Sequence, residues 1–147
     1  MKQNRSSVVP VLVFTAFLSL ILMLSACSSG AGICQDYPAE SPEARYCASH
    51  TEAVMKFVRI TQDPDEQFAR YQAVKHFMKT LTECKTEACM EQKIYGKEAP
   101  EGFSDRYLLE HETAAQGLQL TSREAARLMK SGFEVAMNRL DKKFLQQ

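Results

Sequence analysis

Helix-start signals are the feature that most constrains the fold of this chain. Ser41-Pro42-Glu43 combines an N-cap serine, a proline in the first turn and an acid, a pattern typical of a helix N-terminus. Asp63-Pro64-Asp65-Glu66 is a second start, a D-x-x-E capping box with proline at the first helical position. We expect helices over 43–61 and 64–85, joined at Asp63-Pro64 as an antiparallel hairpin. Along the expected helix 64–85, apolar side chains recur at steps of three and four: Phe68, Tyr71, Val74, Met78 and Leu81.

The rest of the chain carries similar signals. Three further helices are expected: 86–95 ended by Gly96, one from an N-cap at Ser104 to near Gly117, and 122–144 behind a Thr121–Glu124 capping box. Gly132 and Ala136 would let a neighbouring helix approach the last helix closely. No strand-like alternation or sequence repeat is present. The sequence therefore predicts an all-α fold, a compact bundle of four to five helices.

The N-terminus has the plan of a secretion signal. Lys2 and Arg5 precede an uncharged apolar stretch of 17 residues, 8–24. Leu24-Ser25-Ala26-Cys27 then resembles the bacterial lipobox, the motif that closes the signal of a lipoprotein precursor. The resemblance implies cleavage before Cys27, a diacylglyceryl group on its sulfur and usually an acyl group on its new amine. Ser28 implies delivery to the outer membrane, facing the periplasm. An uncleaved membrane anchor followed by a chance cysteine is the alternative.

This resemblance divides the chain into a signal peptide (1–26), a lipidated tether (27–40) and an all-α periplasmic domain (41–147). Cleavage would leave 121 residues with 16 basic and 18 acidic side chains, a formal charge of −2. This balance offers no electrostatic footprint for nucleic acid. The tether begins with small residues, and only six residues separate Cys27 from Cys34. If Cys34 is bridged into the fold, the domain would lie within about 20 Å of the membrane.

Four cysteines remain after Cys27, and an even count in an exported chain favours two disulfides. In a hairpin, residues facing each other have numbers that average near the turn. This favours nested bridges, Cys47–Cys84 and Cys34–Cys89. The local pairs, Cys34–Cys47 and Cys84–Cys89, come second, because five residues of unbroken helix would separate the latter Cα atoms by about 8.6 Å, beyond disulfide reach. A helix break at 85–88 would permit the local pairs.

We find no catalytic constellation, metal-ligand spacing or cofactor fingerprint. His50 and His76 could face each other across the hairpin, but partly exposed helix positions are the simpler interpretation. Glu110-His111-Glu112 does not match a metalloprotease motif. We therefore expect no metal, no cofactor and no enzymatic activity.

Binding to another protein is the remaining function. We expect an envelope protein that binds a second envelope protein, in outline similar to secretin pilotins, which escort and assemble outer-membrane channels. The alternative is an immunity or entry-exclusion lipoprotein that neutralises a periplasmic toxin or incoming conjugation machinery; a cell-wall enzyme comes third. Candidate contact residues are Met90 and Tyr107, where short helices meet a Gly/Pro loop and a groove could open.

Overall fold

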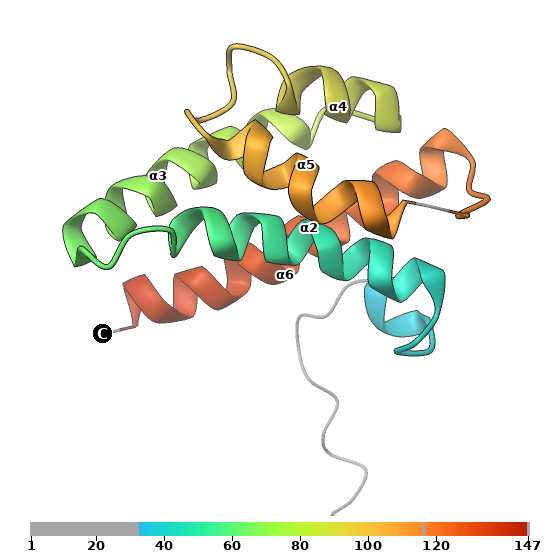
Figure 1. Cartoon of the computed structure of the whole chain (residues 1–147), viewed down its shortest axis with the longest axis horizontal. Coiled ribbons are helices and arrows are strands. Elements are labelled where there is room, and N and C mark those ends of the chain that lie inside the picture. The colour runs from blue at the N-terminus through green and yellow to red at the C-terminus, as the bar shows by residue number, and fades with distance from the viewer. Residues whose placement is uncertain (1–32, 116, 147) are drawn as a thin grey trace, which may run out of the picture.

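The computed structural model describes residues 33–115 and 117–146, and this part of the chain contains helices and no strands. A short 3₁₀ helix precedes five α-helices (Figure 1): η1 (Ile33–Asp36), α2 (Pro42–Val58), α3 (Pro64–Leu81), α4 (Glu87–Ile94), α5 (Phe103–Ala114) and α6 (Ser122–Leu145). Over the same residues, none of the helices has the length and apolar character needed to cross a membrane. The predicted all-α bundle is confirmed. The signal, the lipobox and Cys27 lie outside the described residues.

Local capping explains where most helices begin. The Ser41 hydroxyl accepts a hydrogen bond from the backbone N–H of Ala44, and a carboxylate oxygen of Asp63 accepts from the first turn of α3. Thr121 forms the predicted reciprocal capping box with Glu124. These three starts are confirmed.

Helix α5 begins earlier than predicted. Its N-cap is Gly102, whose φ of +77° lies in the left-handed region that glycine adopts without strain. Ser104 is therefore inside the helix, and its hydroxyl donates a hydrogen bond to the carbonyl of Ile94 (2.5 Å). This start places Phe103 in the core, where it is fully buried. The prediction of Ser104 as the N-cap is wrong.

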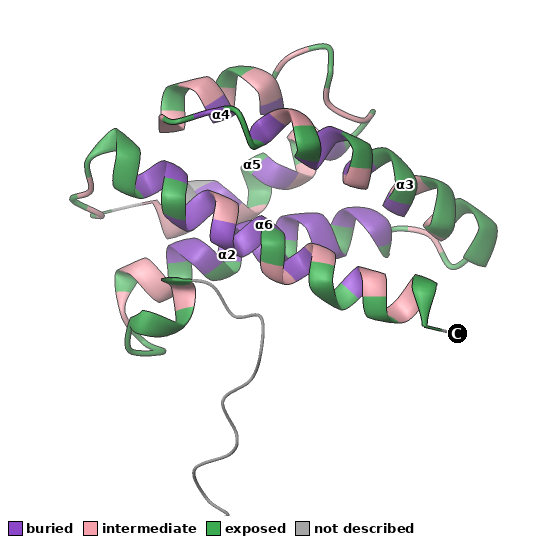
Figure 2. Ribbon diagram, turned by 180° about the vertical axis from the view of Figure 1, so that it is seen from behind, coloured by how far each residue is buried: buried purple, intermediate pink, exposed green. Residues whose placement is uncertain are grey.

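Helix α2 is at the centre of the fold, and its buried positions face the other helices (Figure 2). It packs chiefly against α6 and α5, and much less against α3. At Gly132 of α6 an added Cβ would overlap the carbonyl oxygen of Cys47 and lie 2.9 Å from Cβ of His50. Thr51 donates a hydrogen bond to the Gly132 carbonyl at the same crossing (2.8 Å). The predicted close approach at Gly132 is confirmed.

The disulfides are the local pairs, so the preferred nested connectivity is wrong. Cys34 pairs with Cys47 (Cα–Cα 5.9 Å), and Cys84 pairs with Cys89 (Cα–Cα 5.5 Å). Cys47 faces α6, where its sulfur lies 3.3 Å from the Leu128 carbonyl oxygen. Helix α3 ends at Leu81 and α4 begins only at Glu87, so the segment around Cys84 is not helical. This interruption of the helix brings Cys84 and Cys89 within disulfide range. Nested bridges do not form because α6 and α5, not α3, cover most of α2.

The first bridge also fixes the start of the fold. Helix η1 lies within the stretch 27–40 expected to be a tether, and it packs against α2 and α6. The Cys34 backbone N–H donates to the Ser131 hydroxyl on α6 (3.4 Å). In Figure 1, η1 lies below α2, whereas α5 crosses above it. The N-terminal end of the described fold is thus on the opposite side of α2 from α5.

Candidate functional site

Two Tyr-x-x-x-His segments meet between α2 and α5. Tyr46 and His50 lie one turn apart on α2, and Tyr107 and His111 lie one turn apart on α5. The His50 ring stacks on the Tyr107 ring with centroids 5.5 Å apart, and the two histidine rings lie 5.1 Å apart. Tyr46 contacts both histidines, with centroid distances of 4.6 Å and 5.2 Å. We call these four residues the His–Tyr cluster; Phe133 of α6 closes it beneath His50 (5.3 Å).

Helix α4 brings two carboxylates to the edge of this cluster. The Tyr46 hydroxyl donates a hydrogen bond to Oε1 of Glu87 (2.7 Å). Nε2 of His111 lies 3.8 Å from Oε1 of Glu91. One donor atom from each of Glu87, Glu91 and His111 lies within 4.8 Å of the other two. Among the described residues, these three side chains are a group of the kind that holds a metal ion.

The local structure of α4 explains why both carboxylates point the same way. Glu87 and Glu91 are four residues apart, so they share one face of the helix. The start of α4 is held by the Thr86 cap, by the Cys84–Cys89 bridge and by a hydrogen bond from the Glu87 backbone N–H to the Ser122 hydroxyl on α6 (3.1 Å). These three interactions fix the backbone at Glu87 and so restrict the direction of its side chain.

Burial sets the protonation of the cluster. Burial lowers the pKa of His50 well below the usual range, and repulsion from His111 in its protonated form lowers this pKa further. Burial also lowers the pKa of His111, while the charge of Glu87 partly opposes that shift. The pKa of Glu91 is raised, first by burial and then by repulsion from Glu87. Both histidines are thus neutral at pH 7, the form in which imidazole binds a metal or accepts a hydrogen bond.

Several polar atoms of the cluster have no hydrogen-bond partner within the described part of the chain. They are Nδ1 and Nε2 of His50, Nδ1 of His111 and the Tyr107 hydroxyl. His50 and Tyr107 have no exposed surface, and His111 is 7% exposed. Most buried polar groups in proteins are hydrogen-bonded, and leaving one unpaired costs about 1–3 kcal/mol. A polar interior of this kind marks the cluster as the most unusual place in the core.

The residues of the cluster are far apart in the sequence and follow no single motif. His76 is exposed on α3 and does not face His50. His50, for which a partly exposed position was the simpler interpretation, is instead fully buried and faces His111. The expectation of no metal ligands depended on cysteine and histidine spacing, which does not detect a carboxylate pair on one helix beside a histidine on another. The available signal was the repeated Tyr-x-x-x-His pattern, since it puts two aromatic polar side chains on one face of each helix.

Met90 and Tyr107, the predicted contact residues, are both fully buried. Their prediction as surface residues is wrong, because the early start of α5 at Phe103 packs this helix closely over α2 and α4. Tyr95 covers the Tyr107 ring (centroids 5.8 Å apart), and the Tyr107 ring in turn stacks on His111 (4.9 Å). Neither side chain reaches the surface of the described fold.

The opposite face of α5 is exposed and partly apolar. Leu109 is 67% exposed and Leu108 is 41% exposed. Tyr95, 47% exposed, lies against the same helix through its contact with Tyr107. Lys56 of α2 pairs with Glu110 at one edge (2.8 Å). We call Leu108 and Leu109 the α5 outer face.

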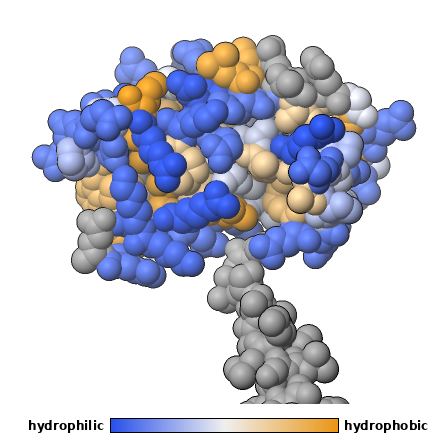
Figure 3. Space-filling view, turned by 60° about the horizontal axis from the view of Figure 1, so that its bottom comes forward, coloured by the Kyte–Doolittle hydropathy of each residue, from blue (hydrophilic) through white to orange (hydrophobic). Residues whose placement is uncertain are grey.

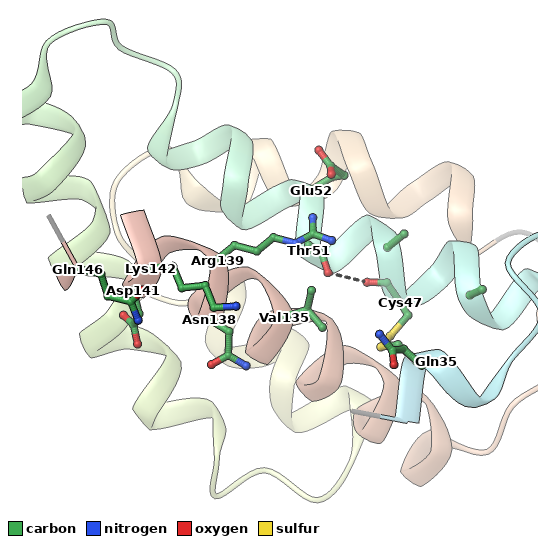
Figure 4. A pocket seen from close by; sticks show the side chains of 13 residues that line it. Gln35, Cys47, Thr51, Glu52, Val135, Asn138, Arg139, Asp141, Lys142 and Gln146 are labelled. Atoms are coloured by element: carbon green, nitrogen blue, oxygen red, sulfur yellow. Dashed lines mark hydrogen bonds between the residues drawn. A yellow bond between two sulfur atoms is a disulfide. The ribbon is translucent and has the colours of Figure 1, made fainter. Parts of the chain in front are cut away.

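The side of the domain that carries η1 differs from this face. Figure 3 turns the lower side of Figure 1 toward the viewer: hydrophilic side chains cover most of it, and hydrophobic ones lie in small separate groups. A groove of about 790 Å³ runs there between α2 and α6, beside the Cys34–Cys47 bridge. Figure 4 shows charged side chains along its edges, including Glu52 of α2 and Arg139 and Lys142 of α6.

Comparison with known proteins finds no relative of this chain: no family model, no curated protein and no solved structure matches it.

Proposed function

We propose that this chain is a lipid-anchored envelope protein that binds another envelope protein through the α5 outer face. The lipobox supports the anchor, with lipidation of Cys27 and placement in the outer membrane on its periplasmic side. The Cys34–Cys47 bridge supports a short leash, because only six residues lie between the lipidated cysteine and the first bridged residue. The domain would then stay within about 20 Å of the membrane surface.

The observation that carries the proposal is the pair of exposed leucines on α5. Leu108 and Leu109 lie side by side in sequence and turn apolar surface to solvent, although the core beneath them is already filled by Tyr107 and Phe103. They lie on the side of α2 away from η1, so the membrane would leave them accessible (Figure 1). An apolar centre with a charged edge, here the Lys56–Glu110 pair, is the usual anatomy of a protein-binding surface.

The proposal covers two kinds of partner. An assembly or escort factor would bind a structural component of the envelope, such as a secretion channel. An immunity or entry-exclusion lipoprotein would instead bind an incoming toxin or conjugation component. Both use a binding surface and no catalytic residue, so the identity of the captured partner decides between them.

The test introduces Leu109→Asp into the full chain and captures partners from the native envelope after crosslinking. Because Leu109 is two-thirds exposed, the charge should leave helical circular dichroism unchanged while the partner is lost. Leu145→Asp is the matched control, a leucine 58% exposed at the far end of α6, and it should retain the partner. Capture of the same partner by Leu109→Asp would contradict the proposed surface.

The lipid anchor is tested by substitutions at and beside Cys27 in the full chain. Cys27→Ser should abolish labelling by a lipid precursor and shift the protein out of the membrane fraction or leave it unprocessed. Ser28→Ala, beside it, should still be labelled. Continued acylation of the Cys27→Ser protein through the same chemistry would overturn the lipoprotein assignment.

A further inference from the structure

We propose that Glu87, Glu91 and His111 bind one divalent transition-metal ion, with Zn²⁺ as the representative, between α4 and α5. The site is independent of the partner-binding proposal, since it lies on the buried side of α5. The ion would bind at the edge of the His–Tyr cluster, through His111 and the two carboxylates of α4.

The geometry is close to that of a metal site. An ion about 2.1 Å from each nitrogen or oxygen donor in tetrahedral geometry holds these donors about 3.4 Å apart. The three donor atoms already lie within 4.8 Å of one another, and the His111–Glu91 pair is at 3.8 Å. Small side-chain rotations of the two glutamates, which are only partly buried, close the remaining gap. His111 itself is held by its ring contacts with Tyr107 and Tyr46.

An independent observation points to a ligand at this place. The Tyr107 hydroxyl is fully buried and has no partner among the described residues, and the Tyr107 ring stacks on the ring of His111 (centroids 4.9 Å apart). A water molecule that completes the coordination of an ion held by these carboxylates would supply the missing hydrogen bond. Catalytic and other open zinc sites keep one position for water in this way.

The surroundings supply the support that metal ligands need. The Tyr46 hydroxyl holds one oxygen of Glu87, and such hydrogen bonds fix the direction of a coordinating carboxylate. Two carboxylates and a neutral imidazole carry a charge of −2, which a divalent cation balances.

The donor set selects the class of metal. Imidazole nitrogen with two carboxylates suits Zn²⁺, Mn²⁺ or Fe²⁺, whereas Ca²⁺ requires six to eight oxygen donors. The cysteines take no part, because all four in the described fold are disulfide-bonded. A bound ion would tie α4 to α5, the two short helices of the fold.

The test uses the untagged full chain in mild detergent under non-reducing conditions, stripped of metal with a chelator. Calorimetric titration with zinc chloride should show a single binding event, and calcium chloride should show none. Glu91→Gln and His111→Ala should each weaken Zn²⁺ binding by at least about tenfold, since even outer-shell changes have effects of that size. Zn²⁺ should also raise the melting temperature of the wild type and not of Glu91→Gln.

Two exposed residues provide matched controls: His76→Ala removes a histidine from α3, and Glu83→Gln removes a carboxylate after it. Both should bind Zn²⁺ as the wild type does. Glu91→Gln preserves side-chain shape, so it remains informative if His111→Ala does not fold. Absence of Zn²⁺ binding by the wild type, or equal binding by folded Glu91→Gln, overturns the site. A loss of Zn²⁺ binding in His76→Ala would also overturn the site. None of these outcomes bears on capture of a partner by the α5 outer face.

Discussion

His50 is fully buried among aromatic rings and has no hydrogen-bond partner within the described residues. Its ring forms a T-shaped pair with Tyr46, stacks on Tyr107, and also contacts the rings of Phe133 and His111. Aromatic pairs of this kind stabilise by about 0.5–1.5 kcal/mol beyond burial alone, which offsets part of the cost of the unpaired ring nitrogens. The neutral ring is therefore tolerated, whereas the charged ring is not.

This residue makes a prediction about pH. The folded-state pKa of His50 and of His111 is lowered, so as the pH falls below about 6.5 the unfolded chain takes up protons that the folded protein does not. The free energy of unfolding should be highest above this pH and should decline below it, by up to about 1.4 kcal/mol per pH unit for each histidine. Urea unfolding followed by circular dichroism at about pH 7.5, 6.5 and 5.5 measures the decline.

Two variants test whether His50 causes the decline in the free energy of unfolding at low pH. His50→Phe keeps an aromatic ring in an aromatic site and removes the titrating group, so the decline should become shallower. His76→Gln removes an exposed histidine and should leave it unchanged. An unaltered pH dependence in His50→Phe would contradict the explanation.

At the scale of the elements, the crossing of α2 and α6 depends on the missing side chain at Gly132. Cys47 and His50 occupy the space where its Cβ would be, and the Cys47 atom concerned is a backbone oxygen that cannot rotate away. The buried faces of both helices meet here, with Cys47, His50 and Thr51 on one side and Met129, Phe133 and Ala136 on the other. The rest of the bundle is arranged around this contact.

Gly132→Ala tests the crossing through the sign of its effect. In an open helix this change stabilises by about 0.5–1 kcal/mol, because alanine loses less backbone freedom on folding. Here the helices must move apart, and we expect the free energy of unfolding to fall by about 1–3 kcal/mol, the usual cost of overpacking. Chemical denaturation measures it. Glu134→Ala, an exposed change on the same helix, should stay within about 0.5 kcal/mol, and a stabilised Gly132→Ala protein would disprove the close packing.

At the scale of the whole molecule, both disulfides join residues close in sequence, with separations of 13 and 5. The first attaches η1 to the α2–α6 core, and the second braces the start of α4. Neither bridge links α2 to α3 or α4, so the helical arrangement depends on side-chain packing. In the chain-entropy account, loops of these lengths contribute about 3 and about 2 kcal/mol, respectively.

The connectivity makes a direct prediction for mass mapping. Trypsin cuts after Arg45 and Lys85, and these sites separate the partners of each bridge. A non-reducing digest at acidic pH should contain peptide 46–56 joined to the peptide that holds Cys34, and peptide 80–85 joined to 86–93. Reduction should release all four. A peptide that joins Cys47 to Cys84 would contradict the structure and restore the nested bridges.

Much of the secondary structure could be predicted because its signals are local. The caps at Ser41, Asp63 and Thr121 act within one turn, through hydrogen bonds to backbone groups two or three residues away. The start of α5 was missed for a similar local reason: glycine at an N-cap makes no side-chain hydrogen bond, so Ser104 was the stronger signal.

The sequence by itself determined the all-α class, three helix starts and the position, Gly132, at which a neighbouring helix can approach closely. Tertiary structure decided which helix faces meet: α6 and α5, far along the chain, cover α2 where the adjacent α3 was expected. That one choice paired Cys47 with Cys34, buried Met90 and Tyr107, and brought His111 beside His50, Glu87 and Glu91. Capping energies depend on neighbouring residues, whereas the choice of partner faces depends on shape and burial summed over the whole chain, and no short stretch of sequence contains it.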